Sequence, residues 1–220
     1  LVGSEMCIRD RYLRLRIPKI NMKMPWHIGL MTGTVLDGNI DVAFLRTDGK
    51  IIEEFGYYNL MPYDEELKEL LIKTLDEAQM WNFNGPEPEI FSKTEAALTN
   101  SQTMAVQKCI KLSGIDENEI GAVGFHGQTV LHRAPCGSLK GATRQLGDGQ
   151  AMANQLGIPV VYDFRSNDMK EGGQGAPLCP IYHAALLKKI GATSNTAILN
   201  LGGLGNLSFF SDEYGLIAFD

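Results

Sequence analysis

The order of the predicted elements constrains this chain most, because three strands come first and helices then alternate with strands. Apolar, strand-like runs at 27–31, 40–46 and 51–60 are joined by short turns, and the Asp-Gly turn at 47–50 favours a hairpin. Three antiparallel strands followed by alternating helices and strands predict an α/β protein, with a mixed sheet and helices packed on its faces.

Helical spacing of apolar residues predicts two long helices, at 64–80 and 92–112. The second opens with Ser-Lys-Thr-Glu, and this spacing predicts a capping box between Ser92 and Glu95. The remaining helices and strands are expected at 120–125, 151–156, 158–164, 180–190, 196–201, 207–210 and 216–219.

Charge and composition exclude several classes of protein. The net charge is −6 and the sequence has no basic stripe, which argues against a nucleic-acid partner. Hydrophobic residues make up 44% of the 220 residues, enough for a substantial core. The four cysteines are widely spaced, which argues against a zinc site or a disulfide framework. No apolar run reaches the length of a membrane span, so we expect a cytoplasmic protein with no membrane partner.

The first residues are expected to lie outside the fold. Residues 1–12 have no helical or strand periodicity and resemble a translated sequencing adapter; a genuine disordered tail is the alternative. Residues 13–25 are basic and are expected to form a leader or linker. The folded lobe is therefore expected to span residues 26–220.

Three glycine clusters follow predicted strands, at 31–38, 171–177 and 200–206. Glycine lets the backbone approach a ligand closely, although a tight turn is the simpler explanation of any single cluster. None of the three has the spacing of a Walker A loop or of a dinucleotide fingerprint.

The first cluster carries polar groups that suit a phosphate. Asp37 and Asp41 flank the turn, and the hydroxyls of Thr32 and Thr34 lie nearby in the sequence. These groups are able to face a phosphate and its metal ion. The alternative is an ordinary Asx turn, in which Asp37 bonds its own backbone.

Polar side chains also follow the strands predicted at 120–125 and 158–164. His126 and Gln128 suit sugar hydroxyls, with a buried histidine bonded to backbone as the alternative. Arg165 is able to bind a substrate carboxylate through a forked pair of hydrogen bonds, with a structural pair to Asp163 or Asp168 as the alternative.

Taken in order, these segments resemble the anhydro-N-acetylmuramic acid kinase family. GLMTGTVLDG at 29–38 is similar to the opening family motif, Gly-x-Met-Ser/Thr-Gly-Thr-Ser-Leu-Asp-Gly, and HGQT at 126–129 matches a second motif. The run at 157–177 matches Gly-Ile-Pro-Val-Val, Asp-Phe-Arg and Gly-Gly-Gln-Gly-Ala-Pro nearly unbroken, and 200–206 matches Asn-x-Gly-Gly-x-x-Asn. The resemblance extends from Ile28 to the end of the chain.

The resemblance implies an actin-like, hexokinase-like (ribonuclease H-like) fold of two lobes with ATP between them. It implies a kinase that uses ATP and Mg²⁺ to open the 1,6-anhydro ring of the sugar and phosphorylate O6, in peptidoglycan recycling. A homodimer is implied for the full-length protein. The family motif Phe-Asp-x-Gly-Pro-Gly-Asn maps onto Phe219 and Asp220, which makes Asp220 the general base. Asp163, which also ends a predicted strand, is the reserve candidate.

The resemblance also implies the binding residues. Those expected at the ATP phosphates are Gly33, Thr34, Val35, Leu36, Asp37, Gly38, Asn39, Ile40, Asp41, Gly202 and Gly203. Those expected at the sugar are His126, Gln128, Arg165, Asp168, Gly172, Gly173, Gln174 and Gly175. No side-chain cluster is expected to hold a metal alone, since magnesium would come with ATP, with Asp37 as its side-chain candidate.

Three features depart from the family pattern. Val35 replaces the usual serine, and the turn at 38–41 has one residue more than usual, which leaves open whether Asp37 or Asp41 faces the metal. The chain ends at Asp220, before the rest of that motif and the second lobe. Two alternatives therefore stay open: an inactive fragment, and an actin-like ATPase or binding module that would turn over ATP without sugar.

Overall fold

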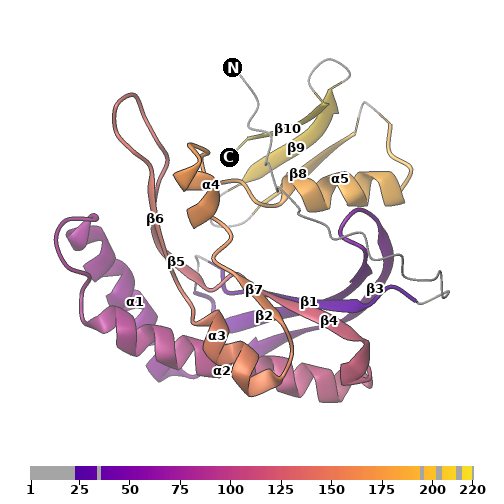
Figure 1. The fold of residues 1–220 in the computed structure, drawn as a ribbon, viewed down its shortest axis with the longest axis horizontal. Helices are drawn as coiled ribbons and strands as arrows, with labels where there is room; N and C mark the ends of the chain where they lie inside the picture. Colours follow the sequence, from indigo (N-terminus) through magenta and orange to yellow (C-terminus); the bar gives the residue numbers. More distant parts are fainter. Residues whose placement is uncertain (1–22, 34–35, 194–195, 202–204, 212–214, 220) are drawn as a thin grey trace, which may run out of the picture.

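The computed structural model describes residues 23–33, 36–193, 196–201, 205–211 and 215–219. Its centre is a five-stranded sheet with the strand order β3-β2-β1-β4-β7 (Figure 1). These strands are β1 (Trp26–Met31), β2 (Asn39–Thr47), β3 (Ile52–Pro62), β4 (Ile120–Phe125) and β7 (Val160–Tyr162). The first three strands pair antiparallel, whereas β4 and β7 run parallel to β1. The mixed α/β sheet expected from the sequence is confirmed.

One face of the sheet is covered by α1 (Glu65–Trp81), α2 (Ile90–Ser113) and α3 (Gly149–Leu156) (Figure 1). Leu71 of α1 and Leu98 of α2 are fully buried in this layer. Each such side chain contributes about 1.5–3 kcal/mol relative to an exposed position. The caps of α1 and α3 are aspartates, Asp64 and Asp148, whose carboxylates accept hydrogen bonds from the first helical turn. Of the helices the structure describes, none is both long and apolar enough to cross a bilayer.

The capping box predicted for α2 is wrong. The helix begins earlier than expected, at Ile90, and its N-cap residue makes no side-chain hydrogen bond. Glu95 is instead held by tertiary partners, because its Oε1 accepts from the backbone N–H of Gly147 at 2.9 Å and lies 3.2 Å from Nη1 of Arg144. The Ser-x-x-Glu spacing therefore lies inside the helix and does not mark its start.

Some elements of the structure were not expected from the sequence. A hairpin of β5 (Gln128–Arg133) and β6 (Ala142–Leu146) extends away from the central sheet, and α4 (Ser166–Lys170) follows β7 (Figure 1). The strand expected at 158–164 is shortened to β7, because the chain turns into α4 soon after it.

The last part of the described chain forms a second sheet. Its strands are β8 (Ala197–Asn200), β9 (Asn206–Ser211) and β10 (Gly215–Phe219), in the order β10-β9-β8. Helix α5 (Pro180–Lys189) packs between this sheet and β3, on the side opposite to α2 (Figure 1).

Candidate functional site

Three loops meet at one edge of the central sheet. Thr32 follows β1, His126 follows β4 and Asp163 follows β7. Because these three strands are parallel neighbours, their carboxyl ends lie side by side. Ligands of α/β proteins usually bind outside this edge, so the candidate residues are placed where a ligand is expected.

The loop after β1 is tied to the loop after β4. The Thr32 hydroxyl donates to the carbonyl oxygen of Gly127 at 3.4 Å, and the Thr32 side chain is buried. The sequence suggested that this hydroxyl could face a phosphate. In the structure it faces the neighbouring loop instead.

His126 and Arg165 contact each other across two loops. Nδ1 of His126 lies 2.9 Å from the carbonyl oxygen of Gly127, which can only accept, so Nδ1 carries the proton. Nε2 of His126 is then the acceptor for Nη2 of Arg165, at 3.0 Å. Nη1 of Arg165 donates to the carbonyl oxygen of Gly175 at 2.6 Å. The guanidinium is therefore fixed at two of its nitrogens.

Asp168 and the glycine loop form a second part of the same unit. Oδ2 of Asp168 accepts from the backbone N–H of Gly175 at 2.8 Å, and its carbonyl oxygen accepts from that of Gly173 at 2.8 Å. A Cβ at Gly173 would lie 2.2 Å from Oδ2 of Asp168, so a larger residue there would displace the Asp168 carboxylate from its place beside Gly175. The structure thus brings His126, Arg165, Asp168 and the 172–175 loop together.

Gln145 of β6 belongs to this group but was missed from the sequence. Its Nε2 lies 3.2 Å from Oγ1 of Thr129, 3.3 Å from the carbonyl oxygen of His126 and 3.4 Å from Nε2 of His126. The short segment at 142–146 carries no motif, and only the hairpin brings it to His126.

Gln128 is not brought to this group. It is the first residue of β5, its side chain is 1% exposed, and its amide nitrogen donates to the carbonyl oxygen of Thr129 at 3.3 Å. Asp163 is exposed at a positive φ of 53°, and its Oδ1 accepts from the hydroxyl of Ser166 at 2.6 Å. Both side chains have a local partner in the fold.

The hairpin between β1 and β2 has the geometry of an Asx turn. Oδ1 of Asp37 accepts from the backbone N–H of Asn39 at 3.0 Å, as the structural alternative expected. Leu36 and Ile40 point into the core, so a phosphate could meet only their backbone. Partial loss of hydration, and then the nearby charge of Asp37, raise the pKa of the Asp41 carboxyl. A cation beside the two carboxylates would relieve this repulsion.

Several expected site residues lie outside the described part of the chain. They are Thr34, Val35, Gly202, Gly203 and Asp220.

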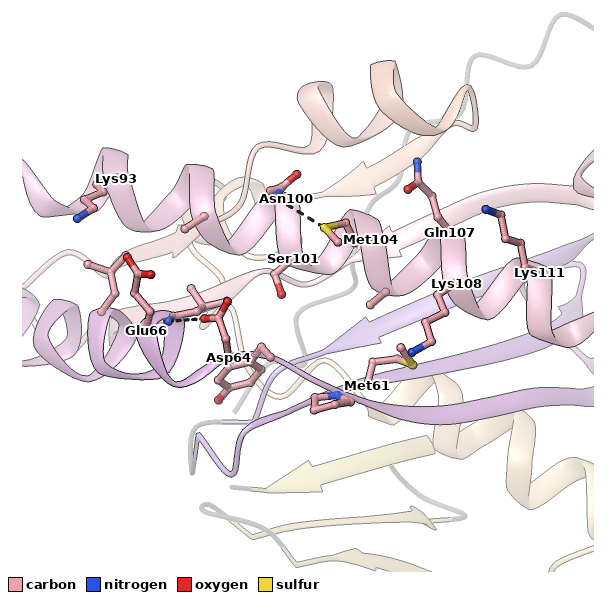
Figure 2. A pocket seen from close by; sticks show the side chains of 16 residues that line it. Met61, Asp64, Glu66, Lys93, Asn100, Ser101, Met104, Gln107, Lys108 and Lys111 are labelled. Carbon is pink, nitrogen blue, oxygen red and sulfur yellow. Dashed lines mark hydrogen bonds between the residues drawn. The ribbon is translucent and has the colours of Figure 1, made fainter.

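A groove of about 690 Å³ lies away from this edge, between the start of α1 and α2. Figure 2 shows Asp64 and Glu66 on one side of it and Lys93, Lys108 and Lys111 on the other. None of the residues that line it is a candidate site residue. Within the described ranges, no three His, Cys, Asp or Glu side chains are grouped closely enough to hold a metal ion.

We expect the imidazole of His126 to stay neutral down to a pH below the ordinary pKa of histidine. Burial, and then the charge of Arg165, lower the pKa of its imidazole, while the hydrogen bond to Gly127 opposes this shift. A histidine whose folded-state pKa is lowered costs stability as the pH falls below the unfolded value of about 6.5, because the unfolded chain then binds the extra proton.

Urea unfolding of the chain between pH 7.5 and 5.0 tests this prediction. The wild type is expected to lose more stability over this range than a His126→Asn variant, whose side chain does not titrate. His27 and His183, whose pKa values are also lowered by burial, contribute equally to both proteins. Parallel pH profiles for the two would contradict the prediction.

The fold and the candidate site define an α/β domain with glycine-rich loops and hydrogen-bonding side chains at the carboxyl edge of a mixed sheet, the edge at which α/β proteins usually bind ligands. Comparison with known proteins identifies the family. Residues 25–220 match the family of anhydro-N-acetylmuramic acid kinases, and the chain belongs to that family.

The curated relatives agree with this assignment. An anhydro-N-acetylmuramic acid kinase of Brucella anthropi is 55% identical over 199 residues, which are 90% of this chain and 54% of the relative. That of Rhizobium rhizogenes gives the same identity and coverage, and anhydro-N-acetylmuramic acid kinase 2 of Jannaschia sp. is 56% identical over 197 residues, 90% of this chain and 52% of the relative. The chain thus spans about half the length of the curated relatives it matches.

Proposed function

We propose that the protein containing this chain is an ATP-dependent sugar kinase that opens 1,6-anhydro-N-acetylmuramic acid and phosphorylates its O6. The observation that supports this most is the Arg165 guanidinium, which is held by His126 and Gly175 at the carboxyl edge of the sheet. Muramic acid carries a carboxylate on its lactyl group, and a fixed guanidinium is the side chain best suited to bind it.

The sugar would lie against the unit built from Arg165, His126 and the 172–175 loop. Arg165 would bind the carboxylate, and the loop that Asp168 closes would meet sugar oxygens through Gln174, because the N–H groups of Gly172, Gly173 and Gly175 already have partners in the chain. Gly172, Gly173 and Gln174 fall in this loop. His126, whose two nitrogens already have partners, would mainly orient Arg165.

The chemical step needs a base near the anomeric carbon. In this proposal the carboxylate of Asp220 takes a proton from water, and the water oxygen bonds to C1. The bond between C1 and O6 breaks, and O6 takes the γ-phosphoryl group from ATP, which leaves ADP. Asp163, which follows β7 at the same edge, is the reserve candidate for this base.

The ATP phosphates would meet the hairpin at 33–41 and the glycines at 202–203. Asp37 and Asp41 would hold the magnesium ion of MgATP, since one or two carboxylates plus phosphate oxygens are its usual ligands. When bound, the ion neutralises charge on the phosphates. The raised pKa of Asp41 is consistent with a place for a cation.

The relatives are kinases by name, which favours the kinase over the alternatives of an inactive fragment and an actin-like ATPase. From the family resemblance, we also propose a role in peptidoglycan recycling in the cytoplasm, with a homodimer as the full-length form.

Product analysis tests the chemistry. A protein of full family length that contains this chain is incubated with ATP and the anhydro-sugar, and the product is weighed by mass spectrometry. The proposal predicts a sugar that has gained both one water and one phosphoryl group. A phosphorylated sugar with its anhydro ring intact would contradict the proposed function.

A further inference from the structure

Helix α2 contacts the loop from β6 to α3 and the loop after β1 through one polar face. Glu95, Thr99 and Gln102 are spaced four and three residues apart, so they lie on the same side of the helix. Glu95 accepts from the backbone N–H of Gly147, and Thr99 Oγ1 accepts from that of Asp148 at 3.0 Å. Both contacts hold the loop that leads from β6 into α3.

Gln102 contacts the loop after β1 directly and the loop after β4 through Thr32. Its Nε2 donates to Oγ1 of Thr32 at 3.3 Å, and the Thr32 hydroxyl donates in turn to the carbonyl oxygen of Gly127 at 3.4 Å. The side chain of Gln102 is fully buried. One amide therefore connects the end of β1, where the hairpin at 33–41 begins, with the loop that carries His126.

The side-chain amide of Gln102 also lowers the stability of the fold. Its Oε1 is buried and has no hydrogen-bond partner among the described residues. A buried polar atom without a partner destabilises a protein, and an apolar side chain of similar shape would avoid that cost. Core packing alone therefore does not explain a glutamine at this position.

We propose that Gln102 is a positioning residue that aligns the hairpin after β1 with the loop after β4. This inference rests on the proposed function, in which the hairpin binds the ATP phosphates and the other loop supports the sugar site. Gln102 would thus act on phosphoryl transfer without touching either ligand.

The first test uses a protein of full family length that contains this chain. The readout is the ratio of ATP turnover with the anhydro-sugar to ATP hydrolysis without it, because this ratio does not depend on the folded fraction. Gln102→Met keeps the size of the side chain and removes the hydrogen bond. It is expected to lower the ratio about tenfold, with a melting temperature no lower than that of the wild type.

Variants of Thr32 and Thr94 make the test specific. Thr32→Val is expected to lower the ratio similarly, Thr32→Ser to preserve it, and Thr32→Val/Gln102→Met to lose no more than the worse single variant. Thr94 is the matched control, because it lies on the same helix, is fully buried and bonds Thr74 at 2.7 Å. Thr94→Val is expected to lower the melting temperature and leave the ratio unchanged. A Gln102→Met ratio within twofold of wild type would overturn the inference.

Amide hydrogen exchange separates this inference from the proposed function. If the two loops are tied through Gln102, Gln102→Met is expected to speed exchange in peptides that cover residues 30–33 and 124–130, and Thr94→Val is not. Unchanged exchange in both segments would overturn the inference whether or not the protein is a sugar kinase. Absence of sugar-dependent turnover in the wild type would overturn the proposed function alone.

Discussion

Replacing Arg165 with lysine is expected to lower kcat/KM for the anhydro-sugar about a hundredfold, which corresponds to about 2.7 kcal/mol. Lysine keeps the charge but carries its donors on a single nitrogen, so it cannot reproduce the planar fork whose separate nitrogens reach Nε2 of His126 and the carbonyl oxygen of Gly175 and still face a carboxylate. Steady-state kinetics on a protein of full family length measure the effect.

Arg133→Lys is the matched control, because Arg133 lies on the nearby hairpin and its guanidinium stacks 5.2 Å from the centre of the Phe83 ring. It is expected to stay within about threefold of wild type. A second comparison uses 1,6-anhydro-N-acetylglucosamine, which lacks the carboxylate, and on this sugar the Arg165→Lys variant and the wild type should differ little. Equal losses on both sugars would show that Arg165 does not bind the carboxylate.

Gly127→Ala is expected to destabilise the chain by about 3 kcal/mol. Gly127 has a φ of +66°, and a Cβ there would lie 2.2 Å from the carbonyl oxygen of Leu146. The carbonyl oxygen of Leu146 is a backbone atom, and the new Cβ is bonded directly to the backbone. The backbone at Gly127 or at Leu146 must therefore move. The melting temperature is expected to fall by about 6–12 °C for a chain of this size.

Gly157→Ala separates the clash from the strain of a positive φ. Gly157 ends α3 at a φ of +68°, and nothing lies within 4 Å of the position of its Cβ. Its replacement is expected to cost only about 1 kcal/mol. Equal losses of stability in the two variants would mean that close packing between Gly127 and Leu146 does not contribute to the loss.

Much of the fold could be predicted because each strand of the central sheet carries its own pattern. The alternation of Ile40, Val42 and Phe44, which are buried, is enough to identify β2 and its inner face. The hairpin of β5 and β6 could not be predicted in the same way. Most of its side chains are half-buried, so the contrast between its two faces is weak.

The site could be predicted only where residues follow strands in a motif. His126, Arg165 and Asp168 were expected at the sheet edge and do lie together. Gln128 belongs to the same motif but is buried, because β5 begins with it and turns it inward. A motif specifies residue types, whereas the direction of each side chain depends on the backbone that follows.

The polar face of α2 could not be predicted because its role depends on tertiary contacts. Thr99 and Gln102 fall among apolar positions of the helix, which is the one signal in the sequence that they have partners elsewhere. Those partners, Asp148 and Thr32, are distant in the chain and become neighbours only in the folded sheet. The sequence alone offered no way to pair them.

Release of ADP with and without 1,6-anhydro-N-acetylmuramic acid tests the central claim most directly. A coupled assay on a protein of full family length that contains this chain is expected to show turnover with the sugar and little without it. An Asp220→Asn variant is expected to lose the sugar-dependent part. ATP turnover of equal rate without sugar would contradict the account, and would favour an actin-like ATPase in which Arg165 and Asp220 have no role toward a sugar.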